Sequence, residues 1–161
     1  KTMKQNELEG MLMENADEPH ANVISHAIID SIKRGIDITT TTQLQQIIEE
    51  ALHFIPEKTR KEDVKKSCQR CFQALRIDVN SEYEVLYEFL EKLPATLAKG
   101  GRVAILSFHS GEDRLIKKSF QKFYREGIYS DIAPKPIRPT AEECYSNSRA
   151  RSTKLRWAIK A

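Results

Sequence analysis

Residues 100–114 read GGRVAILSFHSGEDR, and this stretch decides how the rest of the chain is interpreted. A pair of glycines precedes the short apolar run Val103–Leu106, and a third glycine follows a few residues later. A short, partly β-branched run bounded in this way predicts a strand covered on both faces, as in a parallel sheet. Ligands of open α/β sheets bind beyond the carboxyl ends of the strands. The first candidate site is therefore the cluster directly after this run, namely Ser107, Phe108, His109 and Ser110.

The composition of the 161 residues, 40% hydrophobic and 30% charged, is typical of one soluble globular domain rather than of a disordered chain. No apolar run approaches the roughly 18 residues that a membrane helix needs, and no apolar leader follows Lys1. We expect no membrane segment and a cytoplasmic location, with the mitochondrion or chloroplast as the alternative. Because the chain begins with lysine, we interpret it as a fragment or a processed product.

The three cysteines are an odd number and give no disulfide framework, which indicates a reducing compartment. Cys68 and Cys71 form a C-x-x-C within an expected helix, without a second such pair or paired histidines nearby. Ordinary, partly buried thiols are favoured over a zinc or redox site, and no metal site is predicted.

The first 56 residues predict only helices. Asp17 is expected to cap a helix that has Pro19 in its first turn, and Thr40 with Gln43 has the spacing of a capping box. Residues 57–67 are interpreted as an exposed loop or the start of a helix. One long amphipathic helix is then expected, ended or kinked by Pro94. Its apolar face consists of Phe72, Leu75, Val79, Tyr83, Leu86, Leu90, Leu93 and Leu97.

After the strand at 102–108, Ser110 and Asp113 are expected to cap another helix that ends near Gly127. Residues 128–139 contain three prolines and predict an extended segment, followed by a short helix and a final strand at 155–159. Two or three strands cannot form a covered parallel sheet alone. The sheet must be completed by another chain, for example in a homodimer, or by a missing part of this protein.

Three blocks of the sequence occur in an informative order. They run from Phe72 to Glu82 (FQALRIDVNSE), from Ser107 to Arg114 (SFHSGEDR) and from Pro136 to Arg156. Together they resemble the 16S rRNA cytosine-N4 methyltransferases, the MraW-like family. The chain departs from the usual family sequence at Gly111, where leucine is common, and at Lys66–Ser67, where His-Pro is common.

The resemblance implies an α/β, class I (Rossmann-like) methyltransferase fold with a mostly helical insertion used in substrate recognition. Residues 1–66 would be part of that insertion and residues 67–161 the C-terminal half of the catalytic domain. This chain alone would be mainly α-helical with two or three strands. The implied cofactor is S-adenosylmethionine. Its site is expected mostly outside this chain, in the missing N-terminal half, because no glycine-rich loop occurs here and no cofactor-binding residue is identifiable.

The implied reaction transfers a methyl group to the N4 amine of a cytidine in small-subunit rRNA. That amine is a weak nucleophile, so the site must hold it in line with the sulfonium methyl and accept its hydrogen bonds. The resemblance makes Ser107, Phe108, His109 and Ser110 the candidate catalytic residues. Phe108 would stack on the base, or else be a core residue at the strand end. His109 would contact the base, or else satisfy a local backbone group.

The remaining candidates concern substrate and RNA binding. Gln73, Arg76 and Asn80 share one helix face, for which an exposed helix flank is the alternative. The other substrate-binding candidates are Glu112, Asp113 and Arg114. The two acids can alternatively favour the positive end of the helix dipole. The RNA-binding candidates are Arg138, Arg149, Arg151, Lys154 and Arg156. They suit rRNA phosphates, with internal pairing to Glu142 and Glu143 as the alternative.

Two other function classes stay open from the sequence. One is a non-catalytic RNA-binding or ribosome-assembly protein on a degenerate or truncated methyltransferase fold. The other is a helical protein-interaction module without affinity for RNA. In the leading interpretation the partner is small-subunit rRNA or the ribosomal subunit, and this chain without its cofactor loop is inactive.

Overall fold

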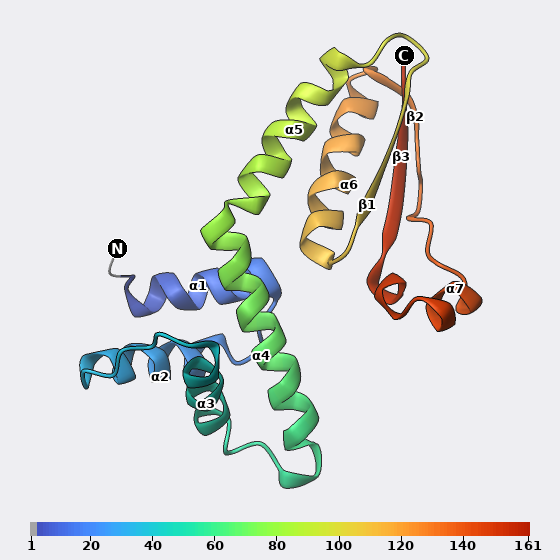
Figure 1. Cartoon of the computed structure of the whole chain (residues 1–161). Coiled ribbons are helices and arrows are strands. Elements are labelled where there is room, and N and C mark those ends of the chain that lie inside the picture. Colours follow the sequence, from blue (N-terminus) through green and yellow to red (C-terminus); the bar gives the residue numbers. More distant parts are fainter. Residues whose placement is uncertain (1–2) are drawn as a thin grey trace. The chain divides into compact units, whose positions relative to one another are not determined.

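The computed structural model describes residues 3–161, which divide into two compact units between Asn80 and Ser81 (Figure 1). The first unit is helical, and the second combines helices with a three-stranded antiparallel sheet. The expectation of a mainly α-helical chain with two or three strands is confirmed. The assignment of residues 1–66 to an insertion and 67–161 to a catalytic half stays a prediction. Within the described residues, no helix is both long and apolar enough to cross a membrane.

The first unit consists of the four helices α1 (Gln5–Ala16), α2 (Ala21–Lys33), α3 (Thr41–Ala51) and α4 (Glu57–Asn80). Apolar side chains of all four form one core, which includes Leu12, Ile24, Ile48, Cys71 and Ala74. The capping box is confirmed, since the Thr40 hydroxyl accepts the Gln43 N–H and the Gln43 side chain returns to the Thr40 backbone. Residues 57–67 are the beginning of α4 rather than a loop.

The expected role of Asp17 is wrong. This residue follows α1 in the left-handed conformation, with φ of 50°, and its N–H donates to the carbonyls at the end of α1. Helix α2 begins only at Ala21, after His20. Asp is among the few non-glycine residues that tolerate this conformation, so it ends one helix instead of starting the next.

Behind this turn, the carboxylate of Glu18 is buried and ties the turn to α4. It accepts hydrogen bonds from the Ser67 hydroxyl at 3.0 Å, the Arg70 Nε at 2.7 Å and the His20 N–H at 3.0 Å. The Glu18 side chain is fully shielded from solvent, whereas that of Arg70 is 31% exposed. A buried carboxylate needs such partners, because its desolvation is otherwise unfavourable.

The single long helix predicted across residues 72–97 is wrong. Helix α4 ends at Asn80, Ser81 takes a left-handed conformation with φ of 50°, and α5 runs separately over Glu82–Thr96. The break shifts the apolar pattern, so that Val79 is 79% exposed instead of buried. Pro94 lies in the last turn of α5. Proline has no N–H to donate, but so close to the end of the helix this removes few helical hydrogen bonds.

In the second unit the order is α5, β1 (Arg102–Ser107), α6 (Ser110–Arg125), β2 (Tyr129–Ile132), α7 (Ala141–Ser146), a 3₁₀ helix (Ser148–Ser152) and β3 (Lys154–Lys160). The strand order is β1-β3-β2, with β3 antiparallel to both neighbours. Strands β1 and β2 therefore run in the same direction and are joined by α6. Figure 1 shows α6 along the sheet, with α5 beside α6. The shared core includes Leu90, Ile116, Phe120, Tyr129 and Ala158.

The prediction that β1 is covered on both faces is wrong for the described chain. Val103 and Ile105 are partly buried on the side of the α6 core, whereas Ala104 and Leu106 are exposed on the other side. Ile105 pairs in register with Arg156 of β3, and Leu106 with Leu155. An apolar run alone does not distinguish a doubly covered strand from one whose second face is bare, because both have the same composition.

Candidate functional site

The predicted cluster lies where β1 ends and α6 begins. The Ser107 side chain is buried, and its hydroxyl donates to the Lys154 carbonyl oxygen at 3.3 Å. The next side chain, Phe108, is 57% exposed, so the alternative of a core residue at the strand end is wrong. An exposed aromatic ring next to polar groups can stack on a planar ligand.

His109, rather than the expected Ser110 or Asp113, caps α6. Its Nδ1 accepts the Glu112 N–H at 3.4 Å, which is the local backbone role that the sequence left open for it. An Nδ1 that accepts indicates the neutral tautomer with its proton on Nε2. This Nε2 lies 3.4 Å from Oε1 of Glu112, whose other oxygen accepts the Phe108 N–H at 2.8 Å. The hydrogen bond from His109 lowers the pKa of Glu112, against an opposing effect of burial.

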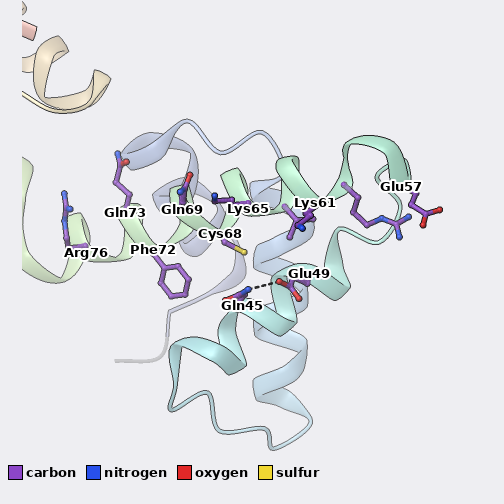
Figure 2. Close-up of a pocket in the computed structure, with 12 residues that line it drawn as sticks. Gln45, Glu49, Glu57, Lys61, Lys65, Cys68, Gln69, Phe72, Gln73 and Arg76 are labelled. Atoms are coloured by element: carbon purple, nitrogen blue, oxygen red, sulfur yellow. Dashed lines mark hydrogen bonds between the residues drawn. The ribbon is translucent and has the colours of Figure 1, made fainter. Parts of the chain in front are cut away.

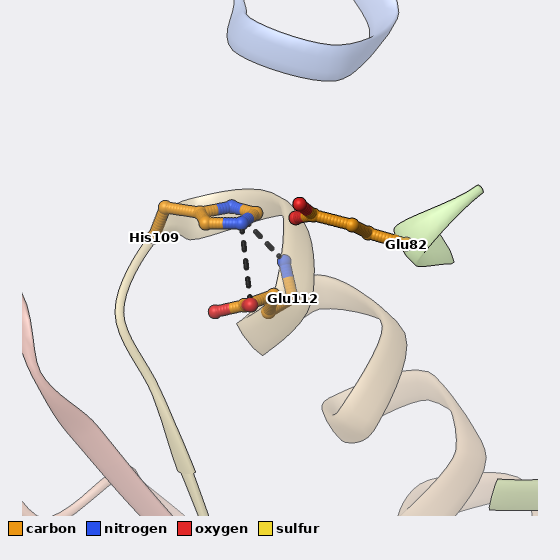
Figure 3. A group of neighbouring side chains, drawn as sticks. All are labelled: Glu82, His109 and Glu112. Carbon is orange, nitrogen blue, oxygen red and sulfur yellow. Dashed lines mark hydrogen bonds and ion pairs between the residues drawn. The ribbon is translucent and has the colours of Figure 1, made fainter. Parts of the chain in front are cut away.

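Glu82, at the start of α5, brings a second carboxylate to this imidazole (Figure 3). One ligand atom from each of Glu82, His109 and Glu112 lies within 4.8 Å of the other two, so the cluster has the composition of a cation site. A metal would need the Nε2 lone pair, but the hydrogen bond at Nδ1 places a proton on Nε2. We interpret the hydrogen bond at Nδ1 and the neighbouring Glu112 carboxylate as the contacts that orient the imidazole, with Glu82 as a second carboxylate beside it.

Tyr83 covers the other side of this turn. Its ring centroid lies 5.9 Å from that of His109, with the planes tilted by 46°. A Cβ atom at Gly111 would lie 1.8 Å from the Tyr83 Oη, so the hydroxyl occupies the space that a side chain at position 111 would need. The packing of Tyr83 thus explains why glycine stands at position 111.

We expect the effect of Gly111→Ala to depend on Tyr83. With Tyr83 present, the added methyl must displace the phenol and should lower the free energy of unfolding by about 1–3 kcal/mol. In a Tyr83→Ala background the same change should raise it by about 0.5–1 kcal/mol, because alanine is the better helix former. Urea unfolding of the four proteins in this double-mutant cycle checks the prediction. Equal effects of Gly111→Ala in both backgrounds would contradict it.

Asp113 lies in the first turn of α6 and forms a buried ion pair with β3. Its carboxylate accepts from the Arg156 Nε at 2.7 Å and Nη2 at 3.3 Å, and from the Lys154 Nζ at 3.3 Å. The exposed fractions are 11% for the Asp113 side chain and 7% for that of Arg156. These two cations of the predicted RNA-binding block therefore pair internally, and their partner is Asp113 instead of Glu142 or Glu143.

The other cations of the block lie at the surface. Arg138 is exposed in the segment after β2, and Arg149 and Arg151 are exposed in the 3₁₀ helix. Asn147 caps this 3₁₀ helix by accepting the Arg149 N–H at 3.1 Å. Among the predicted residues at the start of α6, Ser110 and Arg114 are also exposed.

Three predicted substrate-binding residues, Gln73, Arg76 and Asn80, belong to α4 in the first unit. Gln73 and Arg76 line a groove between α3 and α4 (Figure 2), whereas Asn80 lies at the exposed end of α4. The remaining candidates, from Ser107 to Arg156, belong to the second unit.

Sequence reasoning missed Glu82 and Tyr83 as neighbours of His109. Tyr83 fitted the periodic apolar pattern, which hid its contact with Gly111. A glycine in the first turn of a helix, where larger residues are favoured, was the available signal for a close neighbour.

The whole chain, residues 1–161, matches the MraW methylase family, and the chain belongs to that family. It is 75% identical over its full length to ribosomal RNA small subunit methyltransferase H 2 of Alkaliphilus metalliredigens, of which it covers 46%. It is 66% identical over its full length to ribosomal RNA small subunit methyltransferase H 1 of Lachnoclostridium phytofermentans, of which it covers 44%. The chain thus spans slightly under half the length of these curated relatives.

Proposed function

We propose that this chain is the substrate-side half of an S-adenosylmethionine-dependent enzyme that methylates the N4 amine of a cytidine in small-subunit rRNA. The observation that carries the proposal is the end of β1, where the exposed Phe108 ring stands beside the fixed His109 imidazole. The names of the relatives support rRNA as the substrate.

The topology of the second unit supports a class I, Rossmann-like catalytic fold. Because β1 and β2 both run antiparallel to β3, which lies between them, the β1-α6-β2 segment joins two strands of the same direction through a helix, as crossovers in such sheets do. The candidate residues follow the carboxyl end of β1, where ligands of α/β sheets bind.

For the reaction, the exposed Phe108 ring would stack on a cytosine that has been turned out of its strand. The amine then needs an acceptor that also restricts its position. In the His109–Glu112 pair the carboxylate of Glu112 can accept, because Nδ1 of His109 already accepts an N–H and Nε2 carries a proton. The Phe108 N–H fixes this carboxylate, and a fixed group orients a substrate better than a mobile one.

The cofactor would supply the methyl group from outside this chain. The described residues offer no glycine-rich cradle, because Gly35 and Gly127 follow helix ends and Gly100 lies in the turn into β1. We therefore propose that the part of the relatives that this chain does not cover holds S-adenosylmethionine. We also propose that the protein is located in the cytoplasm.

The test is methylation of small-subunit rRNA by the full-length protein, with N4-methylcytidine measured by mass spectrometry of digested RNA. Phe108→Ala should reduce the rate about 10-fold or more, while Phe108→Tyr should retain most of it, since stacking on a base is worth about 1–3 kcal/mol. Tyr124→Ala, an exposed aromatic on α6, is the matched control. The absence of N4-methylcytidine with the unmodified protein would favour a non-catalytic RNA-binding role instead.

The exposed arginines of the 3₁₀ helix give a separate prediction. Arg149→Gln with Arg151→Gln should weaken rRNA binding and flatten the plot of log affinity against log salt by about 1–2, because each lost phosphate contact removes about 0.7–0.9 from the slope. Fluorescence anisotropy at several salt concentrations measures this. An unchanged slope would refute contact with phosphate.

A further inference from the structure

Helices α4 and α5 meet at Ser81, which lies at the boundary between the two compact units. Ser81 takes a left-handed conformation, with φ of 50° and ψ of 40°. For most residues other than glycine this conformation is about 10-fold less favourable than the right-handed one. Unfavourable backbone conformations persist where the surrounding structure imposes them, and they cluster at switch regions. The chain has such a residue at the point where its two units join.

The side chain of Ser81 does not compensate for this conformation. A serine that precedes a helix usually caps it, because its hydroxyl accepts an N–H of the first turn. The Ser81 hydroxyl accepts no such hydrogen bond from the described residues of α5, although its carbonyl oxygen accepts the Val85 N–H at 3.0 Å. Asp17 is also left-handed, but the turn that follows it is held by the three hydrogen bonds of the buried Glu18 carboxylate.

The sequence also supports a second form, in which α4 and α5 are one continuous helix. Leu75, Val79 and Tyr83 follow one another at intervals of four residues across Ser81, as on one face of an uninterrupted helix. A continuous helix has backbone hydrogen bonds across the junction that two separate helices do not make. It also brings Val79, which is 79% exposed when the helices are separate, next to Tyr83 on the same face.

Local forces leave these two forms close in free energy. The apolar pattern favours the continuous helix, whereas Asp78, Val79, Asn80 and Ser81 are all weak helix formers and favour a break. All four side chains are exposed, so burial does not hold the junction in either form.

The two cores are also independent of the junction. The core of the first unit extends along α4 to Leu75, and the core of the second unit includes α5 from Leu86 onward. A change of backbone conformation at Ser81 therefore leaves the packing of both units intact.

We infer that Ser81 is a two-state hinge. In the broken form its left-handed conformation separates α4 from α5, and in the continuous form a right-handed conformation joins them. Hinges are a few residues at the ends of elements that absorb a large change of φ and ψ, as a single residue does here. The change reorients the helical unit relative to the second unit. A use of this motion in substrate capture rests on the proposed function, whereas the equilibrium itself does not.

The test measures the distance between nitroxide labels at Gln69 of α4 and Ala95 of α5 by double electron–electron resonance in the full-length protein. Both positions are exposed, and labels on non-natural amino acids leave the three cysteines of this chain unchanged. In the continuous form the two positions lie about 39 Å apart along the helix axis, and a bend at Ser81 brings them closer. We expect two distance populations.

Substitutions at the junction should shift these populations in opposite directions. Ser81→Gly should raise the ratio of broken to continuous form about 10-fold, because glycine adopts the left-handed conformation freely and weakens a continuous helix. Asn80→Ala with Ser81→Ala should lower the ratio about 5-fold, because alanine is the best helix former. Lys118→Gly and Lys118→Ala, at an exposed position within α6, are the matched controls and should leave the ratio unchanged.

A single distance population that is the same in all of these proteins would show a rigid junction and overturn the inference. A shift in the same direction for the glycine and alanine variants would also overturn it, since it would not follow the backbone preference of residue 81. The readout is a distance, so the absence of N4-methylcytidine would count against the proposed reaction alone.

Discussion

Asp113→Asn should lower the free energy of unfolding of the second unit by about 3 kcal/mol, because it leaves the Arg156 guanidinium buried without its countercharge. The isosteric amide keeps the shape and part of the hydrogen bonding, so the loss reports mainly on charge. Trp157, the single tryptophan of the sequence, lies beside Arg156 in β3. Its fluorescence during urea unfolding therefore follows this unit.

Two further proteins make the measurement decisive. Asp131→Asn changes an exposed aspartate of β2 and should cost less than about 0.5 kcal/mol. Asp113→Leu combined with Arg156→Met replaces the pair by apolar groups and should recover most of the lost stability. If Asp113→Asn unfolds at the same urea concentration as Asp131→Asn, the ion pair does not stabilise the unit.

The same pair sets a dependence of stability on pH. Burial raises the pKa of Asp113, but the hydrogen bonds and charges of Arg156 and Lys154 outweigh burial and hold the pKa below its ordinary value of 3.8. A carboxyl group with a lowered pKa in the folded state stabilises the fold above its unfolded pKa and loses this contribution as the pH falls through the folded pKa. The unmodified chain should therefore lose stability below about pH 4 more steeply than Asp113→Asn does.

The sequence predicted the elements near the candidate site more reliably than their partners. The strand that begins at Arg102, the short helix after Thr140 and the last strand were all expected from local signals, namely β-branched runs, capping residues and prolines, although β1 ends at Ser107 rather than at the expected residue 108. The pairing of β1 with β3 joins residues about 50 positions apart, and no local signal encodes it. The residues that hold Asp113 and His109 in place could therefore be identified only in the structure.

The same limit explains the errors in the first half of the chain. The periodic apolar pattern continues across Ser81, so it could not predict the break between α4 and α5. That single left-handed residue exposes Val79 and places Tyr83 over Gly111. Likewise, the cations of α4 look alike in the sequence, and only tertiary pairing separates Arg70, which is held by Glu18, from Lys61 and Lys65 in the groove.

Glu18→Ala should be among the most destabilising substitutions in the first unit, with a loss of about 3–5 kcal/mol. The change removes the acceptor of the Ser67 hydroxyl and of the His20 N–H, and it deprives Arg70 of its countercharge. Each buried donor left without an acceptor costs about 1–3 kcal/mol. Arg70 contributes less than a fully buried cation would, because its side chain is 31% exposed and can turn toward water.

Glu18→Gln separates charge from hydrogen bonding at this position. Its amide oxygen can still accept from Ser67 and His20, so we expect a smaller loss of about 1–2 kcal/mol that arises mostly at Arg70. Far-UV circular dichroism during urea unfolding gives the free energies, and hydrogen–deuterium exchange should show faster exchange in α1, α2 and α4. Glu14→Ala, an exposed acid of α1, should change neither quantity measurably. A loss for Glu18→Ala as small as that for Glu14→Ala would show that the turn before α2 is held by apolar packing, and that the buried carboxylate only satisfies donors which would otherwise reach water.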